Sequence, residues 1–360
     1  MTLVLYTSES IPSMQNKLYS SQQEACEAPQ TRVSLATNHE GIVYNRDFSP
    51  ELVAYDETYQ NDQSQSLQFK HHLDSVVALC KSYVTEPQSL VVDVGCGKGA
   101  FVELLRDYGI NAVGYDNAYQ GSNPSIRKCF FDKGSHEKGE LLTLRHVLEH
   151  INDPHSFLID LAEANGYHGH IYIEVPDLDW ILDQSAFFDI FHEHVNYFRM
   201  SDFERLYGDS IVQASKSFGG QYLSIFLNLE SISQWQPASQ YSSSDFAKLQ
   251  KRFDRLIEKE VSTYQELAAS TEIVIWGAAA KGVMFAAKAP ASLRTRMAFA
   301  IDINPYKQNQ YMPVSGLEVL DPTTGLSRLG KDTTVVIMNP NYEKEIKACL
   351  PYNQPCMVLN

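Results

Sequence analysis

The sequence predicts an α/β protein built around a doubly wound parallel sheet, with a small N-terminal domain before it and a C-terminal α/β domain after it. Three observations support this fold class. Residues 91–105 read as a buried strand, a glycine turn and the start of a helix. Residues 88–210 alternate apolar strands with helical patterns, as parallel sheets do. Residues 272–282 repeat the strand, the turn and the helix start near the end of the chain.

Composition limits the class of protein. The 360 residues carry 44% hydrophobic and 20% charged side chains, which is typical of a soluble globular chain of two or three domains. The net charge of −15, with no cluster of Lys and Arg, disfavours nucleic acid as a partner. No apolar run approaches the roughly 18 residues of a membrane span, and the N-terminus lacks the basic start of a signal peptide. Six scattered cysteines without a Cys-x-x-Cys pair disfavour disulfides and zinc and indicate a reducing cytoplasm.

Shifts in composition divide the chain into four parts. They are a small N-terminal domain at 1–62, a core at 63–230, a polar linker with a charged helix at 231–270, and a C-terminal α/β domain at 271–360. The linker is rich in Ser and Gln, and the helix that follows it has an amphipathic pattern.

The N-terminal part is polar and carries two short apolar stretches, 31–36 and 41–45, that predict strands. Tyr55 and Tyr59 then precede a predicted helix at 64–84. The two tyrosines either pack onto the next domain or form a lid whose phenol reaches the substrate. Tyr59 is the candidate for the second role.

The glycine turn at 93–99 is the most informative stretch of the chain. Glycines allow φ > 0 and let a ligand approach the backbone closely. A dinucleotide loop has the spacing Gly-x-Gly-x-x-Gly and seats a pyrophosphate, whereas this turn carries an acid at the strand end that can receive a cationic amino group. The turn resembles motif I of class I S-adenosylmethionine (SAM) methyltransferases, and the alternative is a structural glycine turn in another α/β fold. The cofactor-binding candidates are Asp93, Gly95, Cys96, Gly97 and Gly99.

Two further acids extend the predicted cofactor site. The stretch 111–116 predicts the second strand, and Asp116 at its end can accept both ribose hydroxyls. The alternative for Asp116 is a solvated acid at a strand end. The stretch 129–132 predicts the end of a third strand, where Asp132 would meet the adenine amino group.

The fourth strand, 140–144, runs into Arg145 and His146, which would lie beside the methionine part of the cofactor. Leu-Glu-His at 148–150 and an Asn-Asp-Pro turn follow, and the turn caps a predicted helix at 155–165. The Leu-Glu-His segment with its Asp-Pro turn strengthens the methyltransferase resemblance. A fifth strand at 169–176 ends at a proline.

An aromatic segment at 187–198 contains the sequence His192-Glu193-His194. Aromatic surroundings exclude water, and histidine has the unperturbed pKa nearest neutrality, which suits a general base that removes a proton beside a carbonyl. A His-x-His pair can also bind metal, but no third or fourth ligand stands at a suitable spacing. The third interpretation is a pair of core histidines bonded to backbone. Tyr197, in the same segment, is a candidate for substrate binding.

Two glycines at 219–220 open a strand that continues to residue 225. They either allow a ligand to approach or form a β-bulge.

A second glycine turn follows the strand at 272–276 and carries Gly277, Lys281 and Gly282. A cation beside a helix N-terminus suits a phosphate group. A structural Rossmann-like unit without a ligand explains the same pattern. The stretch 298–305 predicts a second strand of this unit that ends in an acid, Asp302.

Taken in order, these segments are similar to the SAM-dependent C-methyltransferases of deoxysugar biosynthesis and their relatives. The resemblance covers most of the chain after residue 48, and motif I and His-Glu-His are its specific parts. The matching segments are 93–99, 148–154, 174–176, 192–194, 197–198, 218–220, 277–282 and 302–311.

The resemblance implies a Rossmann-like class I methyltransferase core that binds SAM, and a small-molecule substrate that is a nucleotide-linked keto-sugar. A base from the His-Glu-His segment removes a proton beside the ketone, and the enolate takes the methyl group. His194 is then the base, Glu193 orients it or binds a sugar hydroxyl, and His192 supports it. The turn with Gly277, Lys281 and Gly282 would hold the nucleotide or its phosphates.

Two features depart from the family. Its members carry a zinc-binding cysteine cluster in the N-terminal domain, where this chain has only Cys26. The deoxysugar enzymes place a tyrosine directly before His-Glu-His, where this chain has Phe191. Two other functions therefore stay open: O- or N-methylation of another small molecule or glycan, and SAM binding without catalysis.

Overall fold

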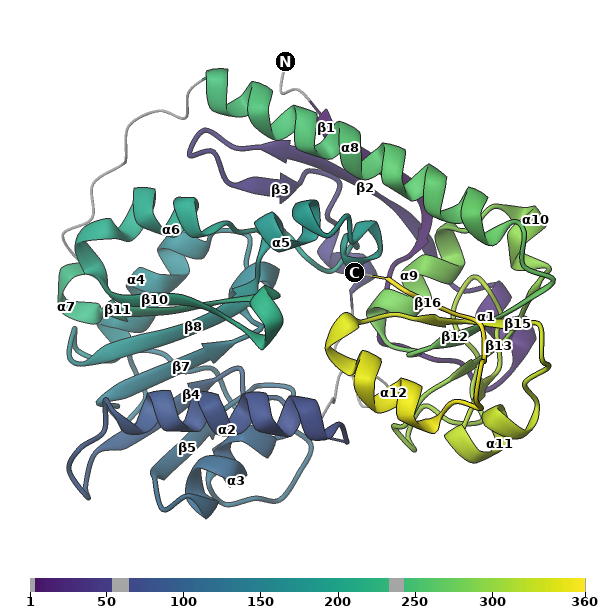
Figure 1. Cartoon of the computed structure of the whole chain (residues 1–360). Helices are drawn as coiled ribbons and strands as arrows, with labels where there is room; N and C mark the ends of the chain where they lie inside the picture. Colours follow the sequence, from purple (N-terminus) through teal and green to yellow (C-terminus); the bar gives the residue numbers. More distant parts are fainter. Residues whose placement is uncertain (1–3, 54–64, 233–242, 360) are drawn as a thin grey trace.

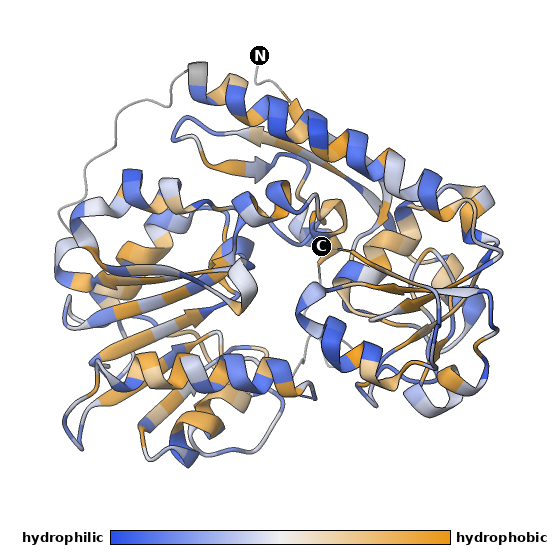
Figure 2. Cartoon of the chain, in the orientation of Figure 1, coloured by the Kyte–Doolittle hydropathy of each residue, from blue (hydrophilic) through white to orange (hydrophobic). Residues whose placement is uncertain are grey.

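The computed structural model describes residues 4–53, 65–232 and 243–359, and Tyr55 and Tyr59 lie outside these ranges. The described residues form three sheets, which are seen side by side in Figure 1. Apolar residues concentrate in the strands, and polar residues cover the outer faces of the helices (Figure 2).

The central sheet has seven strands in the order β10-β11-β8-β7-β4-β5-β6. Strands β4 to β8 run parallel, whereas β11 is antiparallel to both of its neighbours. The strands are β4 (Leu90–Val94), β5 (Asn111–Tyr115), β6 (Ile126–Arg127), β7 (Leu141–Arg145), β8 (His170–Pro176), β10 (Ile211–Ser217) and β11 (Tyr222–Asn228). The predicted Rossmann-like class I methyltransferase fold is confirmed. The strand order reverses between β4 and β7, and ligands of such sheets bind at the carboxyl ends of the strands beside this switch point.

Helices cover both faces of the central sheet. One face packs against α2 (Leu67–Lys81) and α3 (Ala100–Asp107), and the other against α4 (Pro154–Ala164) and α6 (Met200–Tyr207). The Asp153 side chain caps α4 by accepting a hydrogen bond from the Ser156 N–H at 2.9 Å, as the Asn-Asp-Pro turn predicts.

The prediction of a third strand ending at 129–132 is wrong. The strand is β6, and only Ile126 and Arg127 pair with β5. The chain then leaves the sheet, because Phe130 is 68% exposed and the Asp132 carboxylate accepts a hydrogen bond from the Gly134 N–H at 2.8 Å within its own turn. Asp132 therefore lies on an exposed loop.

The N-terminal sheet is antiparallel and has the order β1-β2-β3-β9. Its strands are β1 (Val4–Pro12), β2 (Gln30–Thr37), β3 (Val43–Asn45) and β9 (Asn196–Tyr197). Strand β9 directly follows the His-Glu-His segment, so the middle of the chain supplies the edge strand of this sheet. The two predicted short strands are confirmed as β2 and β3, and the exposed Cys26 ends the short helix α1 (Gln22–Cys26).

The C-terminal sheet is wholly parallel and has the order β14-β13-β12-β15-β16. Its strands are β12 (Glu272–Trp276), β13 (Met297–Ile301), β14 (Val319–Leu320), β15 (Thr333–Ile337) and β16 (Cys356–Val358). Helix α9 (Ala280–Lys288) follows the glycine turn after β12, as predicted. Helix α8 (Ser243–Leu267) precedes the sheet and lies along the N-terminal strands (Figure 1). No helix in the described ranges is both long enough and apolar enough to cross a membrane.

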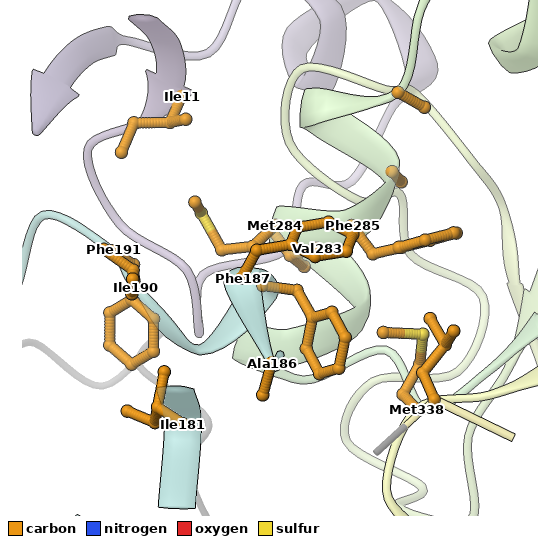
Figure 3. Close-up of a cluster of buried hydrophobic side chains, with 14 of the residues drawn as sticks. Ile11, Ile181, Ala186, Phe187, Ile190, Phe191, Val283, Met284, Phe285 and Met338 are labelled. Atoms are coloured by element: carbon orange, nitrogen blue, oxygen red, sulfur yellow. The ribbon is translucent and has the colours of Figure 1, made fainter. Parts of the chain in front are cut away.

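One hydrophobic cluster joins the N-terminal and C-terminal sheets. It contains residues of β1 and β2, of the segment 178–197, of α8 and of the C-terminal unit, including helix α5 (Leu178–Asp183). Figure 3 shows its centre, where Phe187 lies beside Val283, Met284 and Phe285 of α9. The segment that carries His-Glu-His is therefore part of a shared core rather than a surface loop.

The glycine bend at 218–220 docks the C-terminal unit against the central sheet. Gly219 adopts φ 68°, in the left-handed region. The Asn341 side-chain amide donates a hydrogen bond to the Phe218 carbonyl at 2.9 Å, and the Asn339 amide donates one to Gln221 Oε1 at 3.1 Å. The group that comes close to these glycines is thus Asn341 of the same chain rather than a ligand.

Replacing Gly219 by alanine tests this docking. An added Cβ would overlap the Asn341 side-chain oxygen, and the left-handed backbone would be strained. We expect Gly219→Ala to lower the free energy of unfolding by about 1–3 kcal/mol, measured as a lower midpoint of urea unfolding. Gly208→Ala is the matched control, because a Cβ at Gly208 would meet no atom within 4 Å and Gly208 lies in the right-handed helical region. Equal midpoints for both variants would contradict the docking role.

Candidate active site

The glycine turn after β4 has the predicted conformation. Gly95, Gly97 and Gly99 adopt φ of 72°, 56° and 86°. A Cβ at Gly95 would lie 2.6 Å from Val147 Cγ2, so the segment after β7 packs against this glycine. A Cβ at Gly97 would meet nothing within 4 Å. The middle of the turn is therefore open, as a site for a ligand close to the backbone requires. Cys96 lies half-buried between the two glycines.

The Asp116 carboxylate is fixed at the end of β5, beside this turn. The Gly97 N–H donates to its Oδ2 and the Ala118 N–H donates to its Oδ1, both at 2.8 Å. A carboxylate oxygen has two lone pairs, so each oxygen keeps a position for a hydroxyl. The placement fits the predicted contact with ribose hydroxyls.

Asp93 is buried at the end of β4, with 4% of its surface exposed. Burial raises the pKa of its carboxyl to about 6, although the Thr143 hydroxyl donates a hydrogen bond to it at 2.6 Å and Arg145 favours the charged form. A cationic group near Asp93 would stabilise the carboxylate. The residue is therefore suited to the amino group that its position predicts.

Arg145 and His146 share one buried counter-ion, Glu174 on β8. Arg145 Nη2 lies 2.9 Å and His146 Nε2 3.3 Å from Glu174 Oε1. His72 of α2 lies 3.0 Å from Glu174 Oε2, and the Tyr172 hydroxyl donates to that oxygen at 2.9 Å. Burial alone would raise the pKa of the Glu174 carboxyl, but Arg145, His146 and His72 hold it well below its usual range.

His146 has two carboxylate neighbours and an unusual backbone. Its Nδ1 lies 3.4 Å from Glu149 Oε1, and its φ is 54°, a rare value for a residue with a side chain. Burial lowers its pKa, but Glu149 and Glu174 outweigh burial and raise the pKa to about 9. His146 is therefore a cation at neutral pH.

The two histidines of His-Glu-His point to different partners. The His192 ring stacks on Phe48 at 5.5 Å, its Nδ1 lies 3.4 Å from the Arg32 carbonyl oxygen, and its Nε2 accepts a hydrogen bond from the Ser49 N–H at 3.3 Å. Burial lowers its pKa. His192 thus binds the N-terminal sheet, which agrees with a supporting role.

Glu193 is fully buried and links the same segment to two other elements. Its carboxylate accepts a hydrogen bond from the Gln15 N–H at 2.7 Å, and its carbonyl oxygen lies 2.9 Å from His150 Nδ1. Because a carbonyl can only accept, His150 carries its proton on Nδ1.

His194 is buried, with 6% of its surface exposed. Its ring centre is 4.1 Å from that of Phe191 and 5.0 Å from that of His150. Burial, and then the charges of His150 and His146, lower its pKa well below 6.5. The imidazole is therefore neutral at physiological pH and can accept a proton.

The fold supplies partners that sequence spacing does not reveal. His192 turns away from His194, whereas Glu149 and His150 approach it, and the nearest ligand atoms of these three residues lie within 4.8 Å of one another. Glu149 also contacts His146, and the next residue, Val147, packs against Gly95 of the glycine turn. The signal in the sequence was the Leu-Glu-His segment, but nothing local shows that it meets residues 192–194.

Tyr197 is buried and its hydroxyl has backbone partners. The hydroxyl donates to the Phe191 carbonyl at 2.9 Å and accepts from the Phe191 N–H at 3.0 Å. These bonds fix the backbone before His-Glu-His, and they favour a structural role for Tyr197 over the predicted contact with substrate.

The C-terminal glycine turn faces the same segment. Gly277 adopts φ 115°, and a Cβ at Gly282 would overlap the Gly277 carbonyl, so these glycines allow close packing of α9 on β12. Lys281 Nζ lies 3.0 Å from Asp189 Oδ2 and 4.7 Å from the centre of the Trp180 ring. Lys281 is thus paired with an acid three residues before His192.

The C-terminal unit repeats the geometry of Asp116. The Ala278 N–H donates to Asp302 Oδ2 and the Asn304 N–H donates to Asp302 Oδ1, both at 2.8 Å. Lys98 of the first glycine turn lies 5.8 Å from the centre of the Tyr306 ring, so the loops of the two units face each other.

The charge on His146 gives stability a pH dependence. Its folded pKa of about 9 lies above the ordinary 6.5, so its contribution is fully present below pH 6.5 and is lost as the pH rises through 9. We expect the free energy of unfolding to fall by up to about 3 kcal/mol across this window, since one pKa unit corresponds to about 1.4 kcal/mol. Urea unfolding of His146→Gln should lack this fall. The exposed His136→Gln serves as the control, and an unchanged pH dependence in His146→Gln would contradict the assignment.

Comparisons with known proteins agree with the two α/β units. Residues 69–209 match the family model of a methyltransferase domain, and residues 230–354 match that of a C-methyltransferase C-terminal domain. The C-methyltransferase NovU of Streptomyces niveus is 30% identical over 148 residues, which are 36% of this chain and 34% of that protein. The match thus spans about a third of the length of this curated relative.

Solved structures that resemble the chain are more distant in sequence. The PH0226 protein of Pyrococcus horikoshii OT3 is 17% identical with a TM-score of 0.36, covering 49% of this chain and 99% of that one. Magnesium protoporphyrin IX methyltransferase of Synechocystis PCC 6803 with bound SAH is 18% identical with a TM-score of 0.35, covering 47% of this chain and 87% of that one. Residues 69–209 and 230–354 are thus similar to a methyltransferase domain and to a C-methyltransferase C-terminal domain.

Proposed function

We propose that the protein is a SAM-dependent methyltransferase that methylates a carbon atom beside the carbonyl group of a small molecule. One observation carries the proposal: His194, a buried and neutral imidazole, lies beside Glu149, in the segment after β7 whose Val147 packs against Gly95 of the glycine turn. A base near a methyl donor is the requirement for this reaction.

The residues around the glycine turn fit SAM as the cofactor. Gly97 leaves open space beside the backbone, and Asp116 offers a fixed carboxylate to the ribose. Asp93 receives the cationic amino group, which would stabilise the carboxylate form that burial disfavours. The turn also contains Gly95, Cys96 and Gly99. Arg145 and His146 are assigned to the methionine part of SAM. Asp132, on its exposed loop, remains the candidate for the adenine amino group.

Bound SAM would supply an electrophilic methyl group, which leaves S-adenosylhomocysteine when the S–CH₃ bond breaks. His194 would take the proton from the carbon beside the ketone, and the electron pair left behind as the enolate would form the new C–CH₃ bond. The aromatic neighbours of His194 exclude water, and His150 and Glu193 hold the surrounding segment in place. His192 and Tyr197 fix the same segment to the N-terminal sheet and to its own backbone.

We assign the substrate to the class of nucleotide-linked keto-sugars. The C-terminal unit supports this class, because Gly277, Lys281 and Gly282 surround a helix N-terminus and Asp302 repeats the carboxylate geometry of Asp116. Tyr59 stays a candidate lid residue. The relative NovU bears the name of a C-methyltransferase. A reducing cytoplasm is part of the proposal, and the six free cysteines are consistent with it.

The contact between Asp116 and the cofactor is tested by Asp116→Asn. Hydrogen bonds to a charged group contribute about 1.5–3 kcal/mol, so we expect SAM to bind roughly 10- to 100-fold more weakly, measured by calorimetry. Asp107→Asn, at an exposed acid at the end of α3, should bind like the parent protein. If the parent protein itself binds no SAM, the methyltransferase proposal is wrong.

The base is tested by His194→Ala with SAM and a panel of nucleotide-linked keto-sugars. We expect S-adenosylhomocysteine formation to fall by roughly 10²- to 10⁴-fold, since this is the contribution of a positioned base, while SAM affinity stays unchanged. His168→Ala, which removes a largely exposed imidazole, is the control.

Exchange of substrate hydrogen with D₂O separates the open alternatives. A C-methyltransferase should wash deuterium into the carbon beside the ketone without SAM, and His194→Ala should not. Methyl transfer without such exchange would indicate O- or N-methylation. SAM binding with no turnover on any substrate would indicate a binding module.

A further inference from the structure

We propose that Glu149, His150 and His194 form a binding site for one transition-metal dication of the zinc type, and that the bound ion inhibits the enzyme. The site joins the Leu-Glu-His segment after β7 to the His-Glu-His segment before β9. The inhibitory role rests on the proposed function, in which His194 is the base, whereas the site itself rests on geometry.

The ligand atoms already lie together. One ligand atom from each of the three residues falls within 4.8 Å of the other two. His150 donates its Nδ1 proton to the Glu193 carbonyl at 2.9 Å, which leaves the lone pair on Nε2. Metal-binding histidines commonly make such a bond through their second nitrogen, because it fixes the tautomer and the ring orientation.

Glu149 and His194 each have a buried polar atom without a hydrogen-bond partner in the described ranges. Glu149 is 1% exposed and His194 is 6% exposed. Within those ranges, Glu149 Oε2 and His194 Nδ1 have no hydrogen-bond partner. Leaving a buried polar atom without a partner is unfavourable, and an ion bound there would remove this cost. Glu149 Oε1 faces His146 at 3.4 Å, so Oε2 is the oxygen left for an ion.

The donor set selects the class of ion. Two imidazoles and one carboxylate are a common ligand set for zinc and leave a fourth position open. Magnesium prefers oxygen ligands and keeps its waters, so it fits this site poorly. The site is distinct from the N-terminal cysteine cluster of the family, of which this chain keeps only Cys26.

Metal binding and catalysis compete for one imidazole. An ion bound to His194 occupies the lone pair of that nitrogen, and it places a positive charge beside the position where the base must gain a proton. We therefore expect the ion-bound enzyme to be inactive and the ion-free enzyme to be active.

Titration of the purified full-length chain with Zn²⁺ and with Co²⁺ tests the site. We expect one equivalent to bind by calorimetry, and Co²⁺ to give the visible absorption of a four-coordinate ion. Glu149→Gln and His150→Ala should each weaken binding at least tenfold. The matched control is the double variant Glu140→Gln with His168→Ala, which removes a surface carboxylate and imidazole 2.9 Å apart and should bind like the parent.

Several outcomes would overturn the site: no stoichiometric binding, equal affinity in Glu149→Gln and the parent, or equal loss in the surface double variant. If Glu149→Gln fails to fold by circular dichroism, X-ray absorption of the zinc-loaded parent decides, with two imidazoles and one carboxylate expected around zinc.

Activity measurements separate this inference from the proposed function. Zn²⁺ should abolish methyl transfer, and EDTA should restore it. Activity that requires Zn²⁺ would keep the site but overturn both its inhibitory role and His194 as base. Binding of Zn²⁺ at these residues in a protein that transfers no methyl group would leave the site standing and refute the proposed function.

Discussion

The position of the His194 imidazole depends on the burial of the aromatic segment at 187–198 where three sheets meet. Phe187 and Phe188 are each 1% exposed and pack against Phe285 of the C-terminal unit. The end of the segment pairs with β3 as strand β9. Fully burying one such side chain contributes about 1.5–3 kcal/mol. The segment is therefore held at both ends, and the candidate base between them has little freedom to move.

A second constraint is the buried carboxylate of Glu174. Taking charges out of water is costly unless they are paired, and Glu174 pairs with Arg145, His146 and His72 at once. This cluster keeps His146 protonated beside the proposed cofactor site and lies close to the neutral His194. Two histidines of one site thus have pKa values displaced in opposite directions, because Glu149 and Glu174 outweigh burial at His146, whereas burial dominates at His194.

Local features of the site were predictable because the interacting residues are close in sequence or lie at the ends of adjacent strands. The turn containing Gly97 follows from the glycine spacing, and Asp116 meets it because neighbouring parallel strands end at the same edge of a sheet. The same argument holds for Ala278 and Asp302 in the C-terminal unit. The prediction for 129–132 failed because an apolar pair of residues was assigned to a strand, although Phe130 is exposed.

The sequence by itself determined the two α/β units, the glycine turns and the His-Glu-His segment, since these depend on periodicity and on local backbone requirements. Only the tertiary structure decided how they meet. It turned His192 toward the N-terminal sheet, brought Glu149 and His150 to His194, and placed Lys281 on Asp189. Sequence spacing does not predict these contacts. Distant segments come together because they share a buried hydrophobic core, and no local pattern in the sequence shows this.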